Sequence, residues 1–418
     1  MAVGTIRSVR LPCASTARRV VDPRLVGLLQ VAPHTIGFLA STWVRSLADA
    51  GLPTPAMLAS LTPALGLQVA MDEVVLSVLR DPRLYPSRDD YARAEEETLA
   101  ADALFQDRGW ADDPAAYHLA PAPIGSWHLV PERAAGVSFE HLSFASGYEP
   151  HADEPGRERW MAHRPNRTAH AWVLGSGDLT RPWLVCLHGF GTGTAAVDLR
   201  AFRAAQLHRS YGINVLLPVL PLHGPRASGR RSGDGLMSFD LIDSVHGLAQ
   251  AVWDVRRMVG WLRSLGATTI GTYGLSLGGY TASLLASLEE GLACVIAGIP
   301  ASDIPALYRH HSPLWIRRRA ATFHLWGPET ARVHSVVSPL ALEPKPAWEH
   351  RYVFAGMGDR MATPEQALRL WRHWGEPRIL WYPGGHVGAF WSRGVGAFVH
   401  DALVSSGLAA GAAEATVA

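Results

Sequence analysis

The chain has 418 residues, a formal net charge of +1 from 38 basic and 37 acidic side chains, and 48% hydrophobic residues. This composition excludes an intrinsically disordered chain, which would combine low hydrophobicity with high net charge, and it excludes collagen and small disulfide-framework folds. The balance of charges argues against nucleic acid as a partner, since that function needs a strongly basic surface. Length alone suggests two or three domains, although one large α/β domain with insertions also fits.

The N-terminal 136 residues are predicted to form a helical extension, with helices near 69–79 and 91–105. Residues 25–44 and 50–71 contain no Asp, Glu, Lys or Arg, and each stretch is about long enough to span a bilayer. Prolines and polar groups are costly in hydrocarbon, so apolar helices packed against the main domain are favoured over membrane association. No standard secretory signal is evident, so a cytoplasmic location is expected, with peripheral membrane attachment as the alternative.

The cysteines give no sign of a disulfide framework or a zinc site, because there are only three and they are widely spaced: Cys13, Cys186 and Cys294. Cys186 and Cys294 lie in apolar runs, so buried, reduced thiols are expected there. No metal ion or other cofactor is expected.

From residue 137 onward the pattern changes to short apolar runs that alternate with helix-length segments, which is typical of a parallel sheet covered by helices. The sequence therefore predicts an α/β protein with a doubly wound, mostly parallel sheet. The predicted catalytic domain spans 137–407, with a cap inserted at about 301–346 and a flexible tail at 408–418. The main predicted strands are 183–187, 214–219, 269–274, 293–299, 351–355 and 378–382. In such sheets, ligands bind beyond the carboxyl ends of the strands.

The most informative motif is Gly-Leu-Ser-Leu-Gly at 274–278, which has the G-x-S-x-G pattern of a nucleophile elbow. It follows a predicted strand and opens a predicted apolar helix at 277–288. The flanking glycines leave room for a strained turn that exposes the Ser276 hydroxyl, and the helix N-terminus directs N–H groups toward developing negative charge. We predict that Ser276 is a nucleophile, with a plain strand-to-helix glycine turn as the alternative.

An earlier strand is followed by Leu-His-Gly-Phe-Gly at 187–191, which offers a donor for an oxyanion. Acyl transfer needs preorganised donors at the oxygen of the tetrahedral intermediate. The backbone N–H groups of Phe190 and Leu277 are predicted to form this oxyanion hole. His188 is interpreted as a residue that shapes the loop rather than as a base.

Two later strands end at residues that complete a triad. Asp359 follows the strand at 351–355, and His386 lies in a glycine-rich loop after the final strand. The chain order Ser, Asp, His is that of α/β-hydrolases and differs from the chymotrypsin and subtilisin orders. Asp303 is an alternative partner for His386. A helix-capping aspartate and a loop histidine without a role are the other interpretations of Asp359 and His386.

On these residues, segment 137–403 resembles the α/β-hydrolase superfamily. The motif around Ser276, the run from Asp359 to Pro364 and the Gly-Gly pair before His386 look most like one branch. This branch holds dienelactone hydrolase, acetyl-xylan esterase and prolyl-oligopeptidase-like domains. Residues 222–226 and 338–340 suggest a looser similarity to the α/β-hydrolase domain-containing 18 group. Dienelactone hydrolases use a cysteine nucleophile, whereas this chain has serine, which favours ordinary ester or amide chemistry.

Three further residues are candidates for substrate binding: His223, Arg226 and Tyr280. His223 and Arg226 follow the strand at 214–219, so they are expected to rim the site, where an arginine can hold a carboxylate or phosphate with two hydrogen bonds. The alternative is a structural turn with an ion-paired arginine.

The sequence therefore favours a serine hydrolase that acts on a small-molecule or lipid ester. The alternatives are an aminopeptidase or amidase on the same triad, a membrane-associated lipid-acyl hydrolase, and a non-catalytic binding module. A dinucleotide-dependent oxidoreductase is disfavoured, because G-x-G-x-x-A at 191–196 lacks the acidic residue expected at the end of the next strand. The sequence does not determine the oligomeric state.

Overall fold

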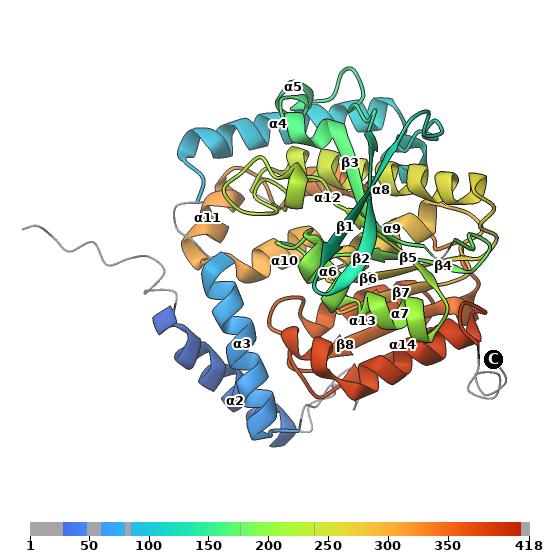
Figure 1. Ribbon diagram of the computed structural model, residues 1–418. Coiled ribbons are helices and arrows are strands. Elements are labelled where there is room, and N and C mark those ends of the chain that lie inside the picture. The colour runs from blue at the N-terminus through green and yellow to red at the C-terminus, as the bar shows by residue number, and fades with distance from the viewer. Residues whose placement is uncertain (1–27, 48–59, 80–84, 176, 238, 411–418) are drawn as a thin grey trace, which may run out of the picture.

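The computed structural model describes residues 28–47, 60–79, 85–175, 177–237 and 239–410, and its centre is a nine-stranded sheet. The strand order is β1-β2-β3-β5-β4-β6-β7-β8-β9 (Figure 1). The strands are β1 (His128–Ala134), β2 (Val137–Ala145), β3 (Thr168–Leu174), β4 (Trp183–Leu187), β5 (Asn214–Val219), β6 (Ile270–Leu275), β7 (Val295–Gly298), β8 (Arg351–Gly356) and β9 (Arg378–Tyr382).

Strand β3 runs antiparallel to both β2 and β5, whereas β5, β4, β6, β7, β8 and β9 all pair in parallel. Every residue of β4, β5, β6 and β7 is buried, as expected for parallel strands covered on both faces. The sheet is therefore mostly parallel, and only β1 and β3, both near its start, run opposite to the other strands, as expected for an α/β-hydrolase sheet with a hairpin added at its edge. The predicted fold class is therefore confirmed.

Helices cover both faces of the sheet and enclose two separate apolar cores. Helices α8 (Leu241–Ser264), α9 (Leu277–Leu288) and α13 (Pro364–His373) contribute to one core, together with Val185 and Leu187 of β4. Helices α6 (Ala195–Ala201), α7 (Ala204–Ser210) and α14 (Arg393–Ser405) contribute to the other, together with Leu184 and Cys186. The alternation along β4 follows from the two-residue period of a strand. Cys186 and Cys294 are buried free thiols, as predicted.

The described helices before the first strand form two separate units that pack against the α/β domain (Figure 1). Helix α4 (Arg88–Asp107) packs against α8 and α12, and its Asp102 is ion-paired with Arg332. Helices α2 (Val31–Leu47) and α3 (Pro63–Leu79) pack against each other, and α3 also lies beside the 3₁₀ helix η7 (Val387–Trp391). Among the described residues, no helix is long and apolar enough to cross a membrane.

The sheet begins earlier than the predicted boundary at residue 137, because β1 forms a hairpin with β2. The connecting residues Ala135 and Gly136 both have positive φ, as in a tight hairpin turn whose twist matches that of the strands. The side chains of β1 are exposed except for the half-buried Ala134, so the sequence there lacks the alternation that marks a half-buried strand.

The predicted cap at 301–346 consists of helices and contains no strand. It is formed by α10 (Ile304–His311), α11 (Leu314–Thr322) and α12 (Pro328–Ser335), between β7 and β8. A short helix, α5 (Arg157–Met161), precedes β3. Cys13, residues 25–27 and 50–59 of the uncharged stretches, and the tail from residue 411 lie outside the described residues.

Candidate active site

Ser276 occupies a strained turn between β6 and α9. Its φ is +59° and its ψ is −115°, a conformation that a residue with a side chain rarely adopts. Two glycines make the turn possible. A Cβ at Gly274 would overlap the Gly278 carbonyl, and a Cβ at Gly278 would overlap the Leu187 carbonyl of β4. Backbone strain that the surroundings hold in place is concentrated at functional sites in proteins.

The predicted oxyanion donors lie beside Ser276. Leu277 is the first residue of α9, and Gly189, next to Phe190, approaches Ser276 closely, since a Cβ there would lie 3.5 Å from the Ser276 Cβ. Across the described part of the chain, the backbone N–H groups of Phe190 and Leu277 donate to no protein acceptor. One unpaired donor at the N-terminus of α9 and a second in the loop after β4 favour the binding of negative charge.

His188 shapes the loop that carries Phe190, in agreement with the interpretation of its sequence. Its side chain is 2% exposed, and its Nε2 accepts a hydrogen bond of 3.0 Å from the Leu220 N–H. The ring is therefore tied to the end of β5 and is not presented to a ligand.

Asp359 and His386 form a buried hydrogen-bonded pair at the ends of β8 and β9. The His386 Nδ1–H donates to Asp359 Oδ2 over 2.7 Å, and both residues are at most 5% exposed. The other carboxylate oxygen of Asp359 accepts from the N–H groups of Met361 and Ala362 at 2.8 and 2.9 Å. This pairing fixes the tautomer in which Nε2 is free to accept a proton.

The electrostatics of the pair favour a protonated imidazole. Burial by itself lowers the pKa of His386, but the Asp359 charge and hydrogen bond, with a further contribution from Asp72, raise that pKa above its usual value of 6.5. A ring that accepts a proton easily suits a general base. Among the described residues, the Ser276 hydroxyl makes no hydrogen bond to His386, and such bonds often tighten only when substrate is bound.

Asp303, the alternative partner of His386, is engaged elsewhere. Its Oδ1 caps α10 by accepting from the Ala306 N–H at 2.9 Å, and its Oδ2 is ion-paired with Arg369. The carboxylate that contacts His386 is therefore that of Asp359.

The sequence did not single out a second carboxylate beside His386. Asp72 of α3 is fully buried, and it accepts hydrogen bonds from the backbone N–H groups of His386, Val387 and Arg360. Its signal in the sequence was an Asp-Glu pair inside an otherwise uncharged, apolar helix.

The three predicted substrate-binding residues are not on the surface of the site. His223, Arg226 and Tyr280 are all 0% exposed. The Arg226 guanidinium, in the 3₁₀ helix η5 (Gly224–Arg226), donates to Asp254 at 2.8 Å and to the carbonyls of Val219 and Asn166. The Tyr280 hydroxyl donates to the Val337 carbonyl at 2.7 Å. Their burial supports the alternative reading of a structural turn with an ion-paired arginine.

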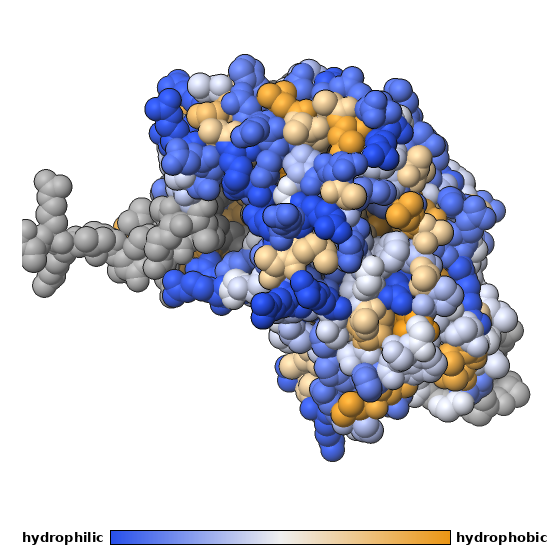
Figure 2. Space-filling view, turned by 90° about the horizontal axis from the view of Figure 1, so that it is seen from above, coloured by the Kyte–Doolittle hydropathy of each residue, from blue (hydrophilic) through white to orange (hydrophobic). Residues whose placement is uncertain are grey.

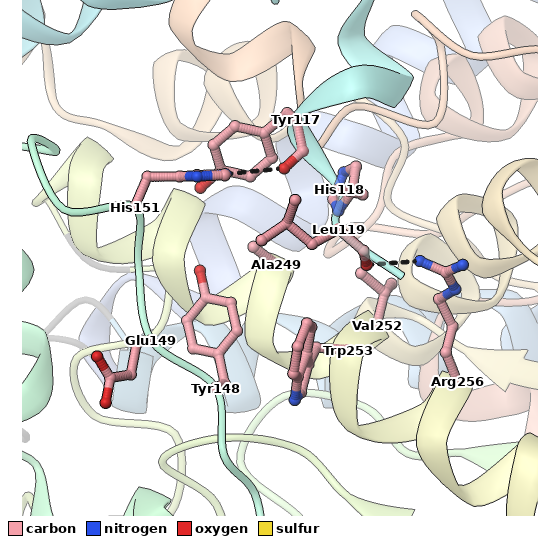
Figure 3. Close-up of a pocket in the computed structure, with 10 residues that line it drawn as sticks. All are labelled: Tyr117, His118, Leu119, Tyr148, Glu149, His151, Ala249, Val252, Trp253 and Arg256. Atoms are coloured by element: carbon pink, nitrogen blue, oxygen red, sulfur yellow. Dashed lines mark hydrogen bonds between the residues drawn. The ribbon is translucent and has the colours of Figure 1, made fainter. Parts of the chain in front are cut away.

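A small cavity on another part of the molecule is too small for a substrate (Figure 3). Its volume is about 30 Å³, enough for about one or two water molecules. Its lining includes none of the predicted catalytic residues and consists of Tyr117, His118, Leu119, Tyr148, Glu149, His151, Ala249, Val252, Trp253 and Arg256. Across the described ranges, no group of three or more His, Cys, Asp and Glu side chains is placed to hold a metal ion.

Two Mycobacterium tuberculosis proteins match this chain along almost its whole length. Uncharacterized protein MT2702, from strain CDC 1551 / Oshkosh, is 41% identical over 396 residues, which is 94% of either chain. Uncharacterized protein Rv2627c, from strain ATCC 25618 / H37Rv, is 40% identical over 396 residues with the same coverage. The chain therefore belongs to the family of these two mycobacterial proteins. No family model matches it.

Several solved structures are also similar to the chain. Acetyl xylan esterase 1 from Thermoanaerobacterium sp. JW/SL YS485 has 14% identity and a TM-score of 0.47, covering 72% of this chain and 93% of its own. The acetyl xylan esterase from Paenibacillus sp. R4 has 16% identity and the same TM-score, covering 71% and 94%. The strand order and pairing of this chain define its fold independently of these similarities.

The burial of Arg226 leads to a stability prediction. Arg226→Ala is expected to lower the free energy of unfolding by about 3–5 kcal/mol, because Asp254 would remain buried without its cation. The matched control is Arg378→Ala, which breaks an exposed pair with Asp401 and is expected to cost at most about 1 kcal/mol. Urea unfolding followed by circular dichroism measures both. Equal costs for the two variants would contradict the structural role of Arg226.

Proposed function

We propose that this protein is a cofactor-independent serine hydrolase that cleaves carboxylic esters. The observation that carries the proposal is the buried Asp359–His386 pair, which lies at the same edge of the sheet as the strained turn of Ser276. A nucleophile, a base and an orienting carboxylate at the ends of three parallel strands of one sheet, β6, β9 and β8, form the constellation that acyl transfer uses.

The proposed mechanism assigns one task to each group. His386 Nε2 removes the proton of the Ser276 hydroxyl, whose oxygen attacks the ester carbonyl, and Asp359 holds the ring and stabilises the imidazolium. The N–H groups of Phe190 and Leu277 bind the oxyanion. His386 then gives its proton to the leaving alcohol, and an activated water molecule hydrolyses the acyl-enzyme at Ser276.

Covalent labelling tests the nucleophile. A fluorophosphonate probe is expected to label the wild-type protein and to leave Ser276→Ala unlabelled, because the probe reacts with an activated serine. The readout is intact-protein mass spectrometry, with the labelled peptide mapped after digestion. A wild-type protein that labels no faster than Ser276→Ala would refute the hydrolase proposal and favour a non-catalytic binding module.

Two aspartate variants test the orienting carboxylate. Asp359→Asn is expected to lower kcat for p-nitrophenyl acetate by up to about 10⁴-fold, because the amide favours the wrong tautomer of His386. Asp303→Asn, which alters a helix cap and an ion pair, is expected to change kcat by less than about 10-fold. The reverse ranking would move the orienting role to Asp303. Aminoacyl anilides, assayed in parallel, separate esterase from aminopeptidase activity.

A lipid ester is a second candidate substrate, favoured by the surface of α2 and α3. In residues 28–44 and 63–78 the only acidic or basic side chains other than His34 are Asp72 and Glu73, and both are buried. The exposed large apolar side chains in these stretches are Leu28, Leu29, Ile36, Trp43, Val44, Leu67, Val74, Val75 and Val78. By contrast, the face that carries α4 and α5 is mainly hydrophilic, with separated apolar patches (Figure 2). Large exposed apolar areas mark contact with lipids, ligands or other proteins.

An acyl-length series tests this candidate. Ile36→Glu combined with Val75→Glu is expected to lower kcat/KM at least about 10-fold for p-nitrophenyl palmitate in mixed micelles. Activity on p-nitrophenyl acetate should be unchanged, because the charges disfavour lipid contact only. Val130→Glu, an exposed position on β1, is the matched control. Equal activity of the double variant and the control on palmitate would exclude the lipid candidate.

A further inference from the structure

Helix α3 reaches the ends of β8 and β9 with a buried carboxylate. Asp72 Oδ2 accepts from the His386 N–H at 2.7 Å and from the Arg360 N–H at 3.1 Å, and its Oδ1 accepts from the Val387 N–H at 3.0 Å. Arg360 immediately follows Asp359. One side chain therefore joins the backbones of the loops that carry the proposed base and the proposed acid.

The packing between α3 and these loops is close. A Cβ at Gly385 would lie 2.7 Å from Asp72 Oδ2, a Cβ at Gly358 would lie 2.6 Å from Leu65 Cδ1, and a Cβ at Gly388 would overlap the amide oxygen of Gln68. Gln68 also accepts a hydrogen bond of 3.0 Å from the Gly385 N–H. The loops can therefore pack this closely against α3 only because these three positions are glycines.

Within the described residues, neither an arginine nor a lysine side chain bonds to Asp72. The nearby Arg360 guanidinium donates to Glu73 at 2.9 Å, and the other oxygen of Glu73 is 3.1 Å from His34 of α2. Burial, and then the charge of Asp359, raise the pKa of Asp72 to about 6. In the unfolded chain the pKa of this aspartate is 3.8, so the folded protein holds the proton more tightly. The free energy of unfolding therefore falls as the pH rises from 3.8 through about 6. At neutral pH the ionised Asp72 side chain opposes folding.

We propose that Asp72 is a positioning residue of the active site, which fixes the loop of His386 against the loop of Asp359 from a helix outside the hydrolase domain. The inference rests on the proposed hydrolase function and deepens it. Asp72 acts through the backbone and charge of these loops and makes no contact with substrate. At neutral pH the charge of Asp72 opposes folding, so a contribution to stability does not explain a carboxylate at this position. Its hydrogen bonds to three backbone N–H groups fit a role in positioning the two loops.

The groups facing Asp72 define its expected effect on pH dependence. They are His386 and Asp359 from the loops, Arg360 and Glu73 beside them, and Tyr382 at the end of β9. The charge of Asp72 raises the pKa of His386, so its loss lowers that pKa. The acidic limb of kcat/KM, where protonated His386 no longer accepts the serine proton, should then move to lower pH.

The test measures kcat, KM and the pH profile for p-nitrophenyl acetate. Asp72→Asn is expected to lower kcat by about 10²-fold with KM within about twofold, because misplacement of the base affects the chemical step. Its acidic limb should move to lower pH, whereas that of Asp72→Glu, which keeps the charge, should stay near the wild-type position. Asp102→Asn is the matched control, since Asp102 is a buried aspartate of the same N-terminal block that pairs with Arg332 on α12.

The outcomes separate the two proposals. Activity that survives in Ser276→Ala refutes the hydrolase function itself. Activity that depends on Ser276, combined with an unchanged kcat and acidic limb in folded Asp72→Asn, refutes the role of Asp72 alone. If Asp72→Asn does not fold, Gln68→Ala replaces it, because it removes the acceptor of the Gly385 N–H and the packing on Gly388 from the same helix without leaving a buried charge unpaired. A reduced kcat at constant KM supports positioning by α3, and an unchanged kcat overturns it.

Discussion

The close approach of β6 and α9 to β4 is the constraint on which the arrangement of this site depends. Ser276 can hold a positive φ because Gly274 and Gly278 have no side chains. Their backbones approach the Gly278 and Leu187 carbonyls more closely than a Cβ atom would allow. That approach places the N-terminus of α9 beside the loop of Phe190. The parallel pairing of β6, β7, β8 and β9 then sets the other two proposed residues, Asp359 and His386, along the same edge.

Around that edge, buried polar groups are held in fixed positions by hydrogen bonds. Asp359 is bonded to His386 and to two backbone N–H groups, and Asp72 is bonded to three. Buried charges without such partners are unfavourable, so each bond restricts the loops to one geometry. Helix α3, which lies before the first strand of the sheet, thus contacts the candidate site directly, and α2 and α3 add an uncharged, apolar surface near it.

Features that depend on the hydrophobic pattern or on glycines within a short segment were predictable from the sequence. The fully buried strands β4 and β5 appeared as apolar runs, and the turn at Ser276 was marked by its glycines. Strand β1 was missed because its side chains are nearly all exposed. His223 and Arg226 were placed at the rim because they follow a strand end. Both are instead buried, and the burial of Arg226 depends on its pairing with Asp254, 28 residues further along the chain on α8.

The sequence by itself determined the α/β class, the order of the strands along the chain and the candidate residues Ser276, Asp359 and His386. These depend on periodicity, glycine geometry and chain order, all of which are local. Only the tertiary structure chose Asp359 over Asp303 as the partner of His386 and placed Asp72 behind them both. Such choices depend on contacts between residues 27 to 314 positions apart, and local patterns do not encode which buried groups meet.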